Sequence, residues 1–379
     1  MGSGSLRFVA IVAVSALPAF SGSIYSQTDL VSDIPGVALI TDPNLVNPWG
    51  MSDSATSPWW VSDNGTGLAT LYSGAGAIVP LVVTVPPPAG SPPGTTSAPT
   101  GQIFNATTDF KVGGAASNFI FTTEDGTISA RTTGTTVTLE VDNSASGADY
   151  KGLALGNNGT ANFLYAANFN SGHIDVFNTN FAPAALAGNF TDPTLPAGYA
   201  PFDVQNIGGV LYVTYALQDA AKHDDVAGPG NGYVDEFDTN GNFIKRLISQ
   251  GPLNSPWGLA LAPGNFGDFS NDLLVGNFGD GMINVFNPST GVFVGDLQDA
   301  GGNPIVNEGL WGLAFGNGSG SGATNALYFT AGIPGPDNVE DHGLFGDIVL
   351  TPEPGTVLLT ALGLGGLLAV RFGRHNPRK

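Results

Sequence analysis

A short phrase that recurs at near-regular intervals constrains the fold of this chain more than any other feature. Its clearest copy runs from Asn254 to Pro263 and reads Asn-Ser-Pro-Trp-Gly-Leu-Ala-Leu-Ala-Pro. Six copies align on Trp49, Thr100, Lys151, Pro201, Trp257 and Trp311. The intervals are roughly 50 to 55 residues, a period typical of solenoids and propellers. The phrase therefore predicts six copies of one structural unit, each opening with the same strand.

Each repeat also contains two short apolar segments on either side of a turn rich in glycine, asparagine and aspartate. In the fifth repeat, residues 272–276 and 282–286 flank the turn 277–281. This pattern indicates an antiparallel hairpin. The opening phrase and a final strand bring the number of strands to four per repeat, and no helical period of useful length appears. The sequence predicts an all-β, six-bladed β-propeller over residues 27–350.

The two ends of the repeat array complement each other. The sixth repeat begins at Leu310 and ends at Leu350 without a fourth strand, whereas residues 25–45 precede the first complete repeat. We expect the N-terminal segment to supply the missing outer strand of the last blade and to close the ring, which removes exposed sheet edges. The Pro-, Gly- and Ser-rich stretch from Pro86 to Pro99 is expected to be a loop between blades.

Composition excludes several classes of function. The chain has 11 basic and 31 acidic residues, so its net charge is 11 − 31 = −20, and it has no cysteine. So acidic a surface repels phosphate backbones, which argues against a nucleic-acid partner. Without cysteine, neither a disulfide framework nor a thiolate metal site can form.

Both termini differ from the repeats. Residues 1–26 contain Arg7 followed by an apolar run, the pattern of a secretory signal peptide, so we expect export. Residues 351–379 contain an almost wholly apolar stretch from Thr356 to Val370, followed by a basic tail. A short apolar segment with a positive end is typical of a transmembrane segment whose tail stays in the cytoplasm.

Residues 351–379 also resemble a known sorting signal. The motif Pro352, Glu353 and Pro354, the apolar segment and the basic tail are similar to the three parts of the PEP-CTERM signal of bacteria. The resemblance implies recognition by a membrane exosortase and removal of the anchor, so the protein would pass from a membrane-anchored intermediate to the cell surface or the extracellular space. An ordinary C-terminal membrane anchor is the alternative.

The body resembles a family of uncharacterised secreted bacterial proteins that carry this signal and look like NHL-type propellers. The likeness rests on residues 30–35, 42–50, 222–230 and 340–346. It implies a fold and a cellular address. It implies no activity, so no catalytic residue is assigned.

Candidate ligand-binding residues follow from the expected geometry. Loops between the second and third strands of each blade emerge on the same face as the connections between blades, and this face commonly binds ligands. Besides Asp63, Glu124 and Asp125, the candidates on these loops are His173, His223, Asp224, Asp225, Asp280, Glu340, Asp341 and His342. Trp49, Trp257 and Trp311 stand at matching repeat positions, which indicates packing between blades and not a sugar platform.

Two of these loops combine imidazole with carboxylates, the donor set of a divalent cation. If they converged on the axis they could hold Ca²⁺ or another divalent ion, with candidate ligands His223, Asp224, Asp225, Asp341 and His342. The alternative is that these residues form solvated turns in an acidic protein.

Two functions remain open. The first is a non-enzymatic binding or structural protein of the cell surface or extracellular matrix, with a surface polymer or protein as partner. The second is a metal-dependent lactonase, other hydrolase or lyase in which a cation polarises an oxygen of the substrate. The acidic surface and the absence of a recognisable catalytic motif favour the first.

Overall fold

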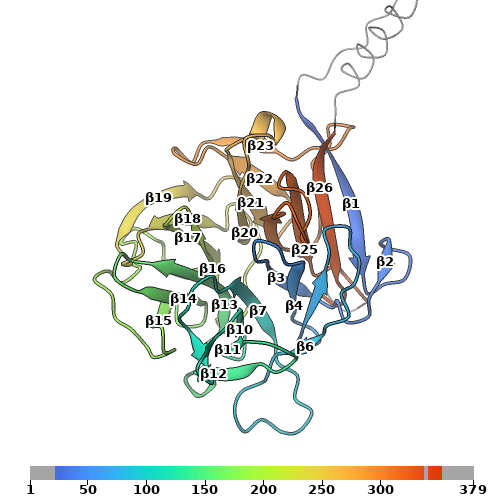
Figure 1. Ribbon diagram of the computed structural model, residues 1–379. Helices are drawn as coiled ribbons and strands as arrows, with labels where there is room; N and C mark the ends of the chain where they lie inside the picture. The colour runs from blue at the N-terminus through green and yellow to red at the C-terminus, as the bar shows by residue number, and fades with distance from the viewer. Residues whose placement is uncertain (1–21, 337–339, 352–379) are drawn as a thin grey trace, which may run out of the picture. The chain divides into compact units, whose positions relative to one another are not determined.

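The computed structural model describes residues 22–336 and 340–351, and Ile24–Thr351 forms one compact unit. Six antiparallel sheets surround a central axis as the blades of a propeller, which confirms the predicted fold class (Figure 1). The first strand of each blade lies nearest the axis and the last lies at the rim. Apart from two short 3-10 helices, Ser144–Ser146 and Gly267–Phe269, the regular structure of the described residues is β-strand.

The strands follow the blades in chain order. Blade 1 contains β3 (Pro48–Ser52), β4 (Trp59–Asp63), β5 (Leu68–Tyr72) and β6 (Val83–Thr84), and blade 2 contains β7 (Pro99–Phe104), β10 (Phe119–Thr123), β11 (Thr127–Arg131) and β12 (Thr138–Asp142). Blade 3 contains β13 (Tyr150–Asn157), β14 (Asn162–Asn168) and β15 (His173–Phe177). Blade 4 contains β16 (Tyr199–Ile207), β17 (Val210–Leu217), β18 (Tyr233–Phe237) and β19 (Phe243–Ser249), and blade 5 contains β20 (Pro256–Leu261), β21 (Leu273–Asn277), β22 (Ile283–Phe286) and β23 (Phe293–Asp296).

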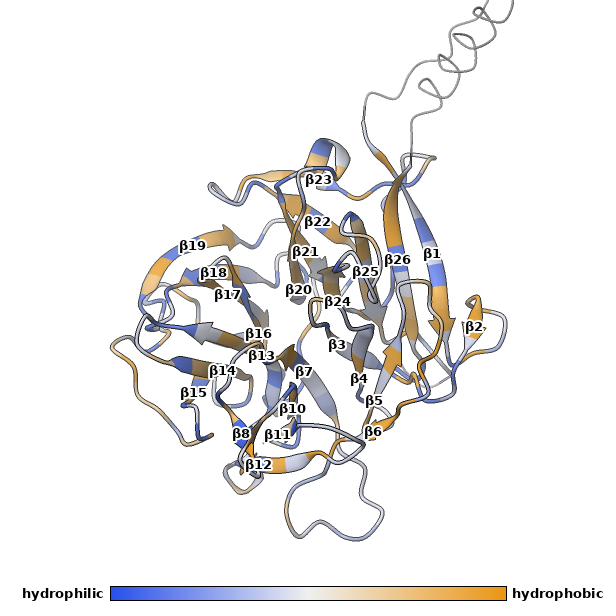
Figure 2. Ribbon diagram, in the orientation of Figure 1, coloured by the Kyte–Doolittle hydropathy of each residue, from blue (hydrophilic) through white to orange (hydrophobic). Residues whose placement is uncertain are grey.

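Blade 6 closes the ring as predicted. It contains β24 (Leu310–Phe315), β25 (Ala326–Ala331), β26 (Leu344–Thr351) and, as its outer strand, β1 (Ile24–Ser32). Strand β1 pairs antiparallel with β26 from Ile24 opposite Thr351 to Ser32 opposite Leu344. In both β1 and β26, apolar residues toward the two ends flank a more polar middle, residues 26–29 in β1 and 346–347 in β26 (Figure 2). Because β1 begins at Ile24, its first three residues lie within the segment 1–26 that sequence analysis assigned to the signal peptide.

The core consists of layers between neighbouring blades, because most strands bury both faces. In β4, Trp59 and Val61 pack toward blade 6, whereas Trp60 packs toward blade 2. The same alternation produces a buried cluster between each of the four remaining pairs of neighbouring blades. A period-2 strand buried on both faces reads as a continuous apolar run, which is the pattern seen in the repeats.

Two details differ from the prediction. Blade 3 has three strands and not four, because the segment after β15 forms only an isolated bridge between Pro183 and Phe177. Proline has no N–H to donate to a strand ladder, which limits pairing there. In blade 4, Phe202 and not Pro201 occupies the position of Trp49. The following residue, Asp203, lies against Gly152 in the way that Gly152 itself lies against Gly101 of the preceding blade. The loop between β6 and β7 matches the predicted inter-blade loop.

Three shorter elements complete the described chain. Strand β2 (Ile40–Thr41) pairs parallel with β1, and β8 (Lys111–Val112) pairs with β9 (Ala115–Ala116). None of the helices in residues 22–336 and 340–351 has the length and apolar character needed to cross a membrane. Most of the predicted signal peptide and the sorting motif Pro352, Glu353 and Pro354 lie outside the described residues.

Candidate functional site at the loop face

The loops between second and third strands meet the starts of the first strands at one end of the central channel. There they enclose a cavity of about 420 Å³, which we call the loop-face cavity. It is lined by Asn47, Trp49, Asn64, Glu124, Lys151, Phe202, His223, Asp224, Asp225, Phe278, Trp311 and Glu340. Five of the six blades contribute such a loop residue, so the predicted convergence of these loops is observed.

Aromatic rings form the floor of this cavity. Trp49 and Trp311 stack with their ring centroids 3.6 Å apart, and Phe278 stacks on the Trp311 ring at 4.2 Å. Trp257 meets both tryptophans edge-on, at 6.1 and 5.8 Å. The three tryptophans are at most 4% exposed. They pack between blades, as predicted. Trp311 contacts the tryptophans of its two neighbouring blades, and Trp49 and Trp257 meet across the axis, because the first strands bring the rings together there.

Asparagine side chains connect the wall of the cavity across blades 6, 1 and 2. Asn47 Nδ2 donates to Glu340 Oε1 and to Asn64 Oδ1, each at 3.3 Å. Asn64 Nδ2 in turn donates to Glu124 Oε2 at 2.9 Å. Asn47 Oδ1 also accepts a hydrogen bond from the Trp311 indole N–H at 3.2 Å, which ties the wall to the floor. These mutual bonds hold the polar groups in place before any ligand arrives.

A buried lysine extends the wall into blade 3. Lys151 occupies the position that tryptophan has in blades 1, 5 and 6, and its side chain is only 2% exposed. Its ammonium donates to Glu124 Oε1 and lies 3.3 Å from Asp149 Oδ2. Burial would lower the pKa of Lys151, but the two carboxylates outweigh it and raise that pKa, so the lysine is charged.

The pKa values of the two carboxylates beside Lys151 shift in opposite directions. Burial would raise the pKa of Glu124, but the Lys151 charge and the hydrogen bonds from Lys151 and Asn64 lower it. Burial raises the pKa of Asp149 to about 7 despite the same lysine. Glu124 is therefore the ionised partner of Lys151 at neutral pH.

Glu340 is the proton-holding member of the wall. Burial, together with the negative charge of Glu124, raises its pKa to about 7. Its backbone has a φ of +85°, a left-handed conformation that is unfavourable for a residue with a Cβ. Such strain persists only where surrounding contacts enforce it, and it is frequent at functional sites.

Stability should fall as pH rises from the ordinary glutamate pKa of 4.5 to about 7, and Glu340 should contribute to that fall. In this window the folded chain keeps a proton on Glu340 that the unfolded chain has lost, so raising the pH favours unfolding. Replacing Glu340→Gln should flatten the curve. Urea unfolding of both proteins between pH 4 and 8 measures this, and parallel curves would contradict the assignment. Asp149 and Asp235 have pKa values of about 7 and leave the same residual slope in both proteins.

Three further predicted residues line the cavity from the long loop between β17 and β18. His223 Nδ1 lies 3.0 Å from Asp224 Oδ1, and both side chains are more than half exposed. Burial would lower the pKa of His223, but the bond to Asp224 raises it. Burial raises the pKa of Asp225. Together with Glu124 and Glu340, these are the sequence candidates that the structure brings to the loop-face cavity.

The other four candidates do not line this cavity. His173 begins β15 and lines a separate groove beside blade 3. Asp280 accepts hydrogen bonds from Asn254 and Asn277, each at 3.2 Å, and shapes its own turn. His342 Nδ1 lies 2.7 Å from Asp33 Oδ2, which ties its loop to the segment after β1. Asp341 is absent from the lining and lies against Gly335.

The described residues contain no group of three or more His, Asp or Glu side chains that could hold a metal ion. The two histidine-containing loops therefore do not combine His223, Asp224, Asp225, Asp341 and His342 into one ligand set. His223 and His342 point to different neighbours, an aspartate on the same loop and one after β1.

Sequence reasoning missed Lys151, Asp149 and the two asparagines. Lys151 had one available signal, because it is a basic residue at a repeat position where other blades have an aromatic ring. Asn47 precedes the Pro-Trp pair of blade 1, and Asn64 is one of many asparagines in turns. Nothing in the sequence distinguishes that turn asparagine from the others.

Two viral proteins are similar to this chain in sequence. Uncharacterized protein R648 of Acanthamoeba polyphaga mimivirus is 32% identical over 333 residues, which cover 84% of this chain and 78% of that protein. Uncharacterized protein L690 of the same virus is 32% identical over 299 residues, covering 75% and 77%. No family model matches the chain. Since these relatives are viral, the bacterial family with a PEP-CTERM signal stays a prediction.

Solved structures share the fold at low sequence identity. The α-L-arabinanase of Penicillium chrysogenum, solved with arabinobiose, has a TM-score of 0.52 and 10% identity, covering 86% of this chain and 97% of that chain. A structural genomics protein of unknown function from Bacteroides thetaiotaomicron has a TM-score of 0.50 and 10% identity, covering 88% and 74%. At such identities the likeness concerns the fold alone.

Proposed function

The chain belongs to the family of the uncharacterised mimivirus proteins R648 and L690, and we propose that it is an exported, non-enzymatic binding protein whose loop-face cavity holds a neutral, hydroxyl-rich ligand. A sugar unit of a surface polymer has this chemistry. The observation that carries the proposal is the cavity itself, whose amide and carboxylate wall is already ordered above a rigid aromatic floor.

The chemistry of the wall favours hydroxyl groups. Asn47 and Asn64 offer both donors and acceptors, and Glu340 adds a group that donates when it is protonated. Hydroxyl groups also both donate and accept, so they match this mixture. Anions are disfavoured because Lys151, the only lysine or arginine among the described residues that line the cavity, is already paired with Glu124 and Asp149. A volume of about 420 Å³ lies within the usual range of small-molecule pockets, so one or two sugar units fit and a whole polymer does not.

A pair of matched histidine variants tests the proposal. His223 lies on the loop between β17 and β18, and His173 begins β15 directly after the corresponding loop of blade 3. Both are exposed, but only His223 lines the cavity. Titration of methyl glycosides and short oligosaccharides, followed by tryptophan fluorescence and calorimetry, should detect binding through the aromatic floor. His223→Ala should weaken binding by about tenfold, the effect of one lost hydrogen bond of about 1.4 kcal/mol, and His173→Ala should not. Equal affinity of the two variants, or no binding to the unmodified protein, would refute the proposal.

One observation favours the second candidate, a hydrolase or lyase that acts on a lactone or ester. Glu340 and Glu124 lie on one wall with pKa values shifted in opposite directions, an arrangement that can separate an acid from a base. A lactone and ester screen, with and without added Ca²⁺ and after chelation, tests it. Lactone or ester turnover that is lost in Glu340→Gln, by a protein that binds no glycoside, would favour this candidate. A melting temperature unchanged by chelation would speak against its metal-dependent form.

We include localisation in the proposal: the protein is exported and processed at both ends. Support comes from the apolar run behind Arg7 and from the Pro352-Glu353-Pro354 signal followed by an apolar segment and a basic tail. In a host with an exosortase, the mature protein should lack both ends. Its intact mass, measured from the surface and medium fractions, checks this, and a full-length product in the cytosol would contradict it.

A further inference from the structure

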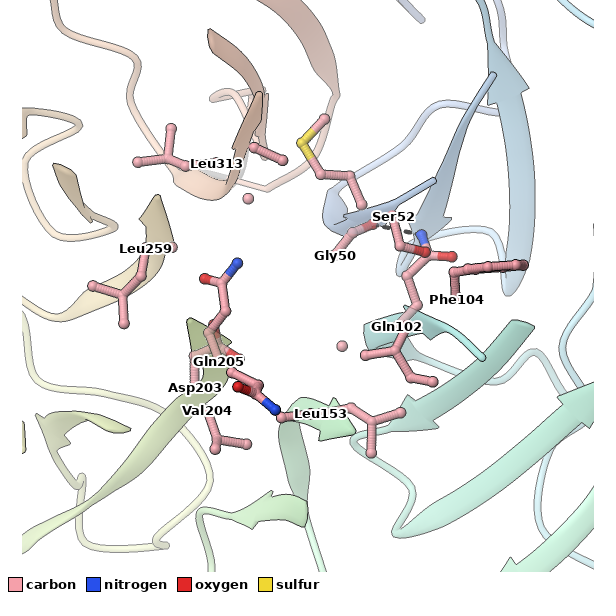
Figure 3. Close-up of a pocket in the computed structure, with 18 of the residues that line it drawn as sticks. Gly50, Ser52, Gln102, Phe104, Leu153, Asp203, Val204, Gln205, Leu259 and Leu313 are labelled. Atoms are coloured by element: carbon pink, nitrogen blue, oxygen red, sulfur yellow. Dashed lines mark hydrogen bonds between the residues drawn. The ribbon is translucent and has the colours of Figure 1, made fainter. Parts of the chain in front are cut away.

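A second cavity occupies the channel on the other side of the aromatic floor. It measures about 570 Å³ and is lined by the first strands of all six blades, and we call it the axial cavity (Figure 3). The rings of Trp49, Phe202 and Trp311 line the loop-face cavity, whereas the residues that follow each of them line the axial cavity. The aromatic floor therefore separates two sites with different linings.

Glycine is the rule at the start of the axial cavity. Five first strands have it directly after the floor position: Gly50, Gly101, Gly152, Gly258 and Gly312. A Cβ added to Gly258 would lie 2.3 Å from the Trp311 carbonyl oxygen, and one added to Gly101 would lie 2.5 Å from the Leu153 nitrogen. The first strands thus approach too closely for a side chain at this position.

Blade 4 breaks the rule with an aspartate. Asp203 takes the glycine position, and a Cβ on Gly152 of the neighbouring blade would lie 2.1 Å from Asp203 Oδ1. The glycine of blade 3 therefore leaves the space that the Asp203 carboxylate fills. Hence Asp203 is accommodated by a specific neighbour, and it brings an acidic group to the axis (Figure 3).

The Asp203 carboxylate lacks a countercharge. The residue is only 6% exposed, and none of the lysines or arginines in the described residues lines the axial cavity. Apart from the nearby backbone N–H of Val204, no described residue donates to the carboxylate, and burial raises its pKa well above the ordinary range. An unpaired buried carboxylate is costly, so a bound cation would stabilise its charged form.

The rest of the lining suits an organic cation. Gln102 is also 6% exposed, and its Oε1 has no hydrogen-bond partner among the described residues. Gln205 reaches from β16 into the opening (Figure 3). The Gln205 amide provides an acceptor for N–H donors. Met51, Ile103 and Leu155 of the lining are partly exposed and provide apolar surface for a short alkyl chain.

We propose that the axial cavity is a second binding site, which takes a small organic cation whose ammonium group pairs with Asp203. A metal ion fits less well, because Asp53 is the only other carboxylate in the lining and it already accepts a hydrogen bond from Ser321 Oγ. The site is independent of the proposed function of the loop-face cavity, from which the aromatic floor divides it.

Calorimetric titration of the full-length protein with n-butylammonium chloride tests this site. The neutral and anionic counterparts of the probe are 1-butanol and butyrate. One butylammonium should bind per chain, with at least tenfold preference over either counterpart. Asp203→Asn, which keeps the shape of the side chain, and Asp203→Gly, which installs the residue of the other five blades, should each weaken binding at least tenfold.

His223→Ala is the control for location, because His223 lines only the loop-face cavity and its loss should leave butylammonium binding unchanged. Unchanged affinity in Asp203→Asn, equal binding of 1-butanol, or no binding to the unmodified protein would overturn the proposal. Loss of binding in His223→Ala would also overturn it, since the cation would then occupy the loop-face cavity. Circular dichroism establishes that Asp203→Gly is folded, and if it is not, Asp203→Asn decides.

Discussion

Replacing Lys151→Met should destabilise the protein by about 3–5 kcal/mol at neutral pH. The side chain is 2% exposed and neutralises Glu124, so its removal leaves a buried carboxylate without a countercharge. Methionine fills a similar volume, which limits the loss to the charge. Urea unfolding measures the effect. Adding Glu124→Gln to Lys151→Met should restore part of the stability, because it removes the orphaned charge.

Lys245→Met is the matched control. Lys245 lies 3.4 Å from Glu236, but its side chain is 38% exposed. Exposed pairs of this kind contribute at most about 1 kcal/mol. If the two lysine variants lost equal stability, or if Glu124→Gln worsened Lys151→Met, the polar wall would not depend on this ion pair in the way proposed here.

Trp311→Ala should cost about 3–5 kcal/mol, because it removes the ring on which the aromatic floor is built. Trp311 is 1% exposed and contacts Trp49, Trp257, Phe202 and Phe278. Trp311→Phe should lose less, since it keeps an aromatic ring but not the indole N–H that donates to Asn47. Thermal and urea unfolding of both variants measure the difference.

The Trp311 variants also test the separation of the two cavities. In Trp311→Ala, butylammonium should compete with ligands of the loop-face cavity, because the floor between the sites is opened. Phe293→Ala is the control, as this phenylalanine is 43% exposed on β23 and its loss should change stability by less than about 0.5 kcal/mol. If the Trp311→Ala protein were as stable as that control, the aromatic floor would contribute nothing to the free energy of unfolding.

Part of the site was open to prediction because propeller topology directs loops of one type to one face. The residues His223, Asp224, Asp225 and Glu340 were selected on that ground, and they line the loop-face cavity. His342 belongs to the same class of loop, yet it turns to Asp33. The loop type places a residue on the face, but contacts with other segments decide where its side chain points.

The sequence by itself determined the number of blades, the order of their strands and the closure by β1 and β26. These features follow from local signals, the two-residue alternation of strands and the repeated opening phrase, which short stretches of chain carry on their own. The shift in blade 4 from Pro201 to Phe202 shows the limit of such signals, since proline precedes the aromatic position in blades 1 and 5 as well.

Only the tertiary structure decided which residues meet at the axis. Three contacts illustrate this: the pairing of Lys151 with Glu124, the stacking of Trp49 on Trp311 and the fit of Asp203 against Gly152. Each joins residues of two different blades. Ring closure sets the distances between these residues. A change of about an ångström in such a distance alters both the packing and the charge of the buried groups. A repeat pattern specifies each blade alike, whereas the chemistry of both cavities comes from the positions at which the blades differ.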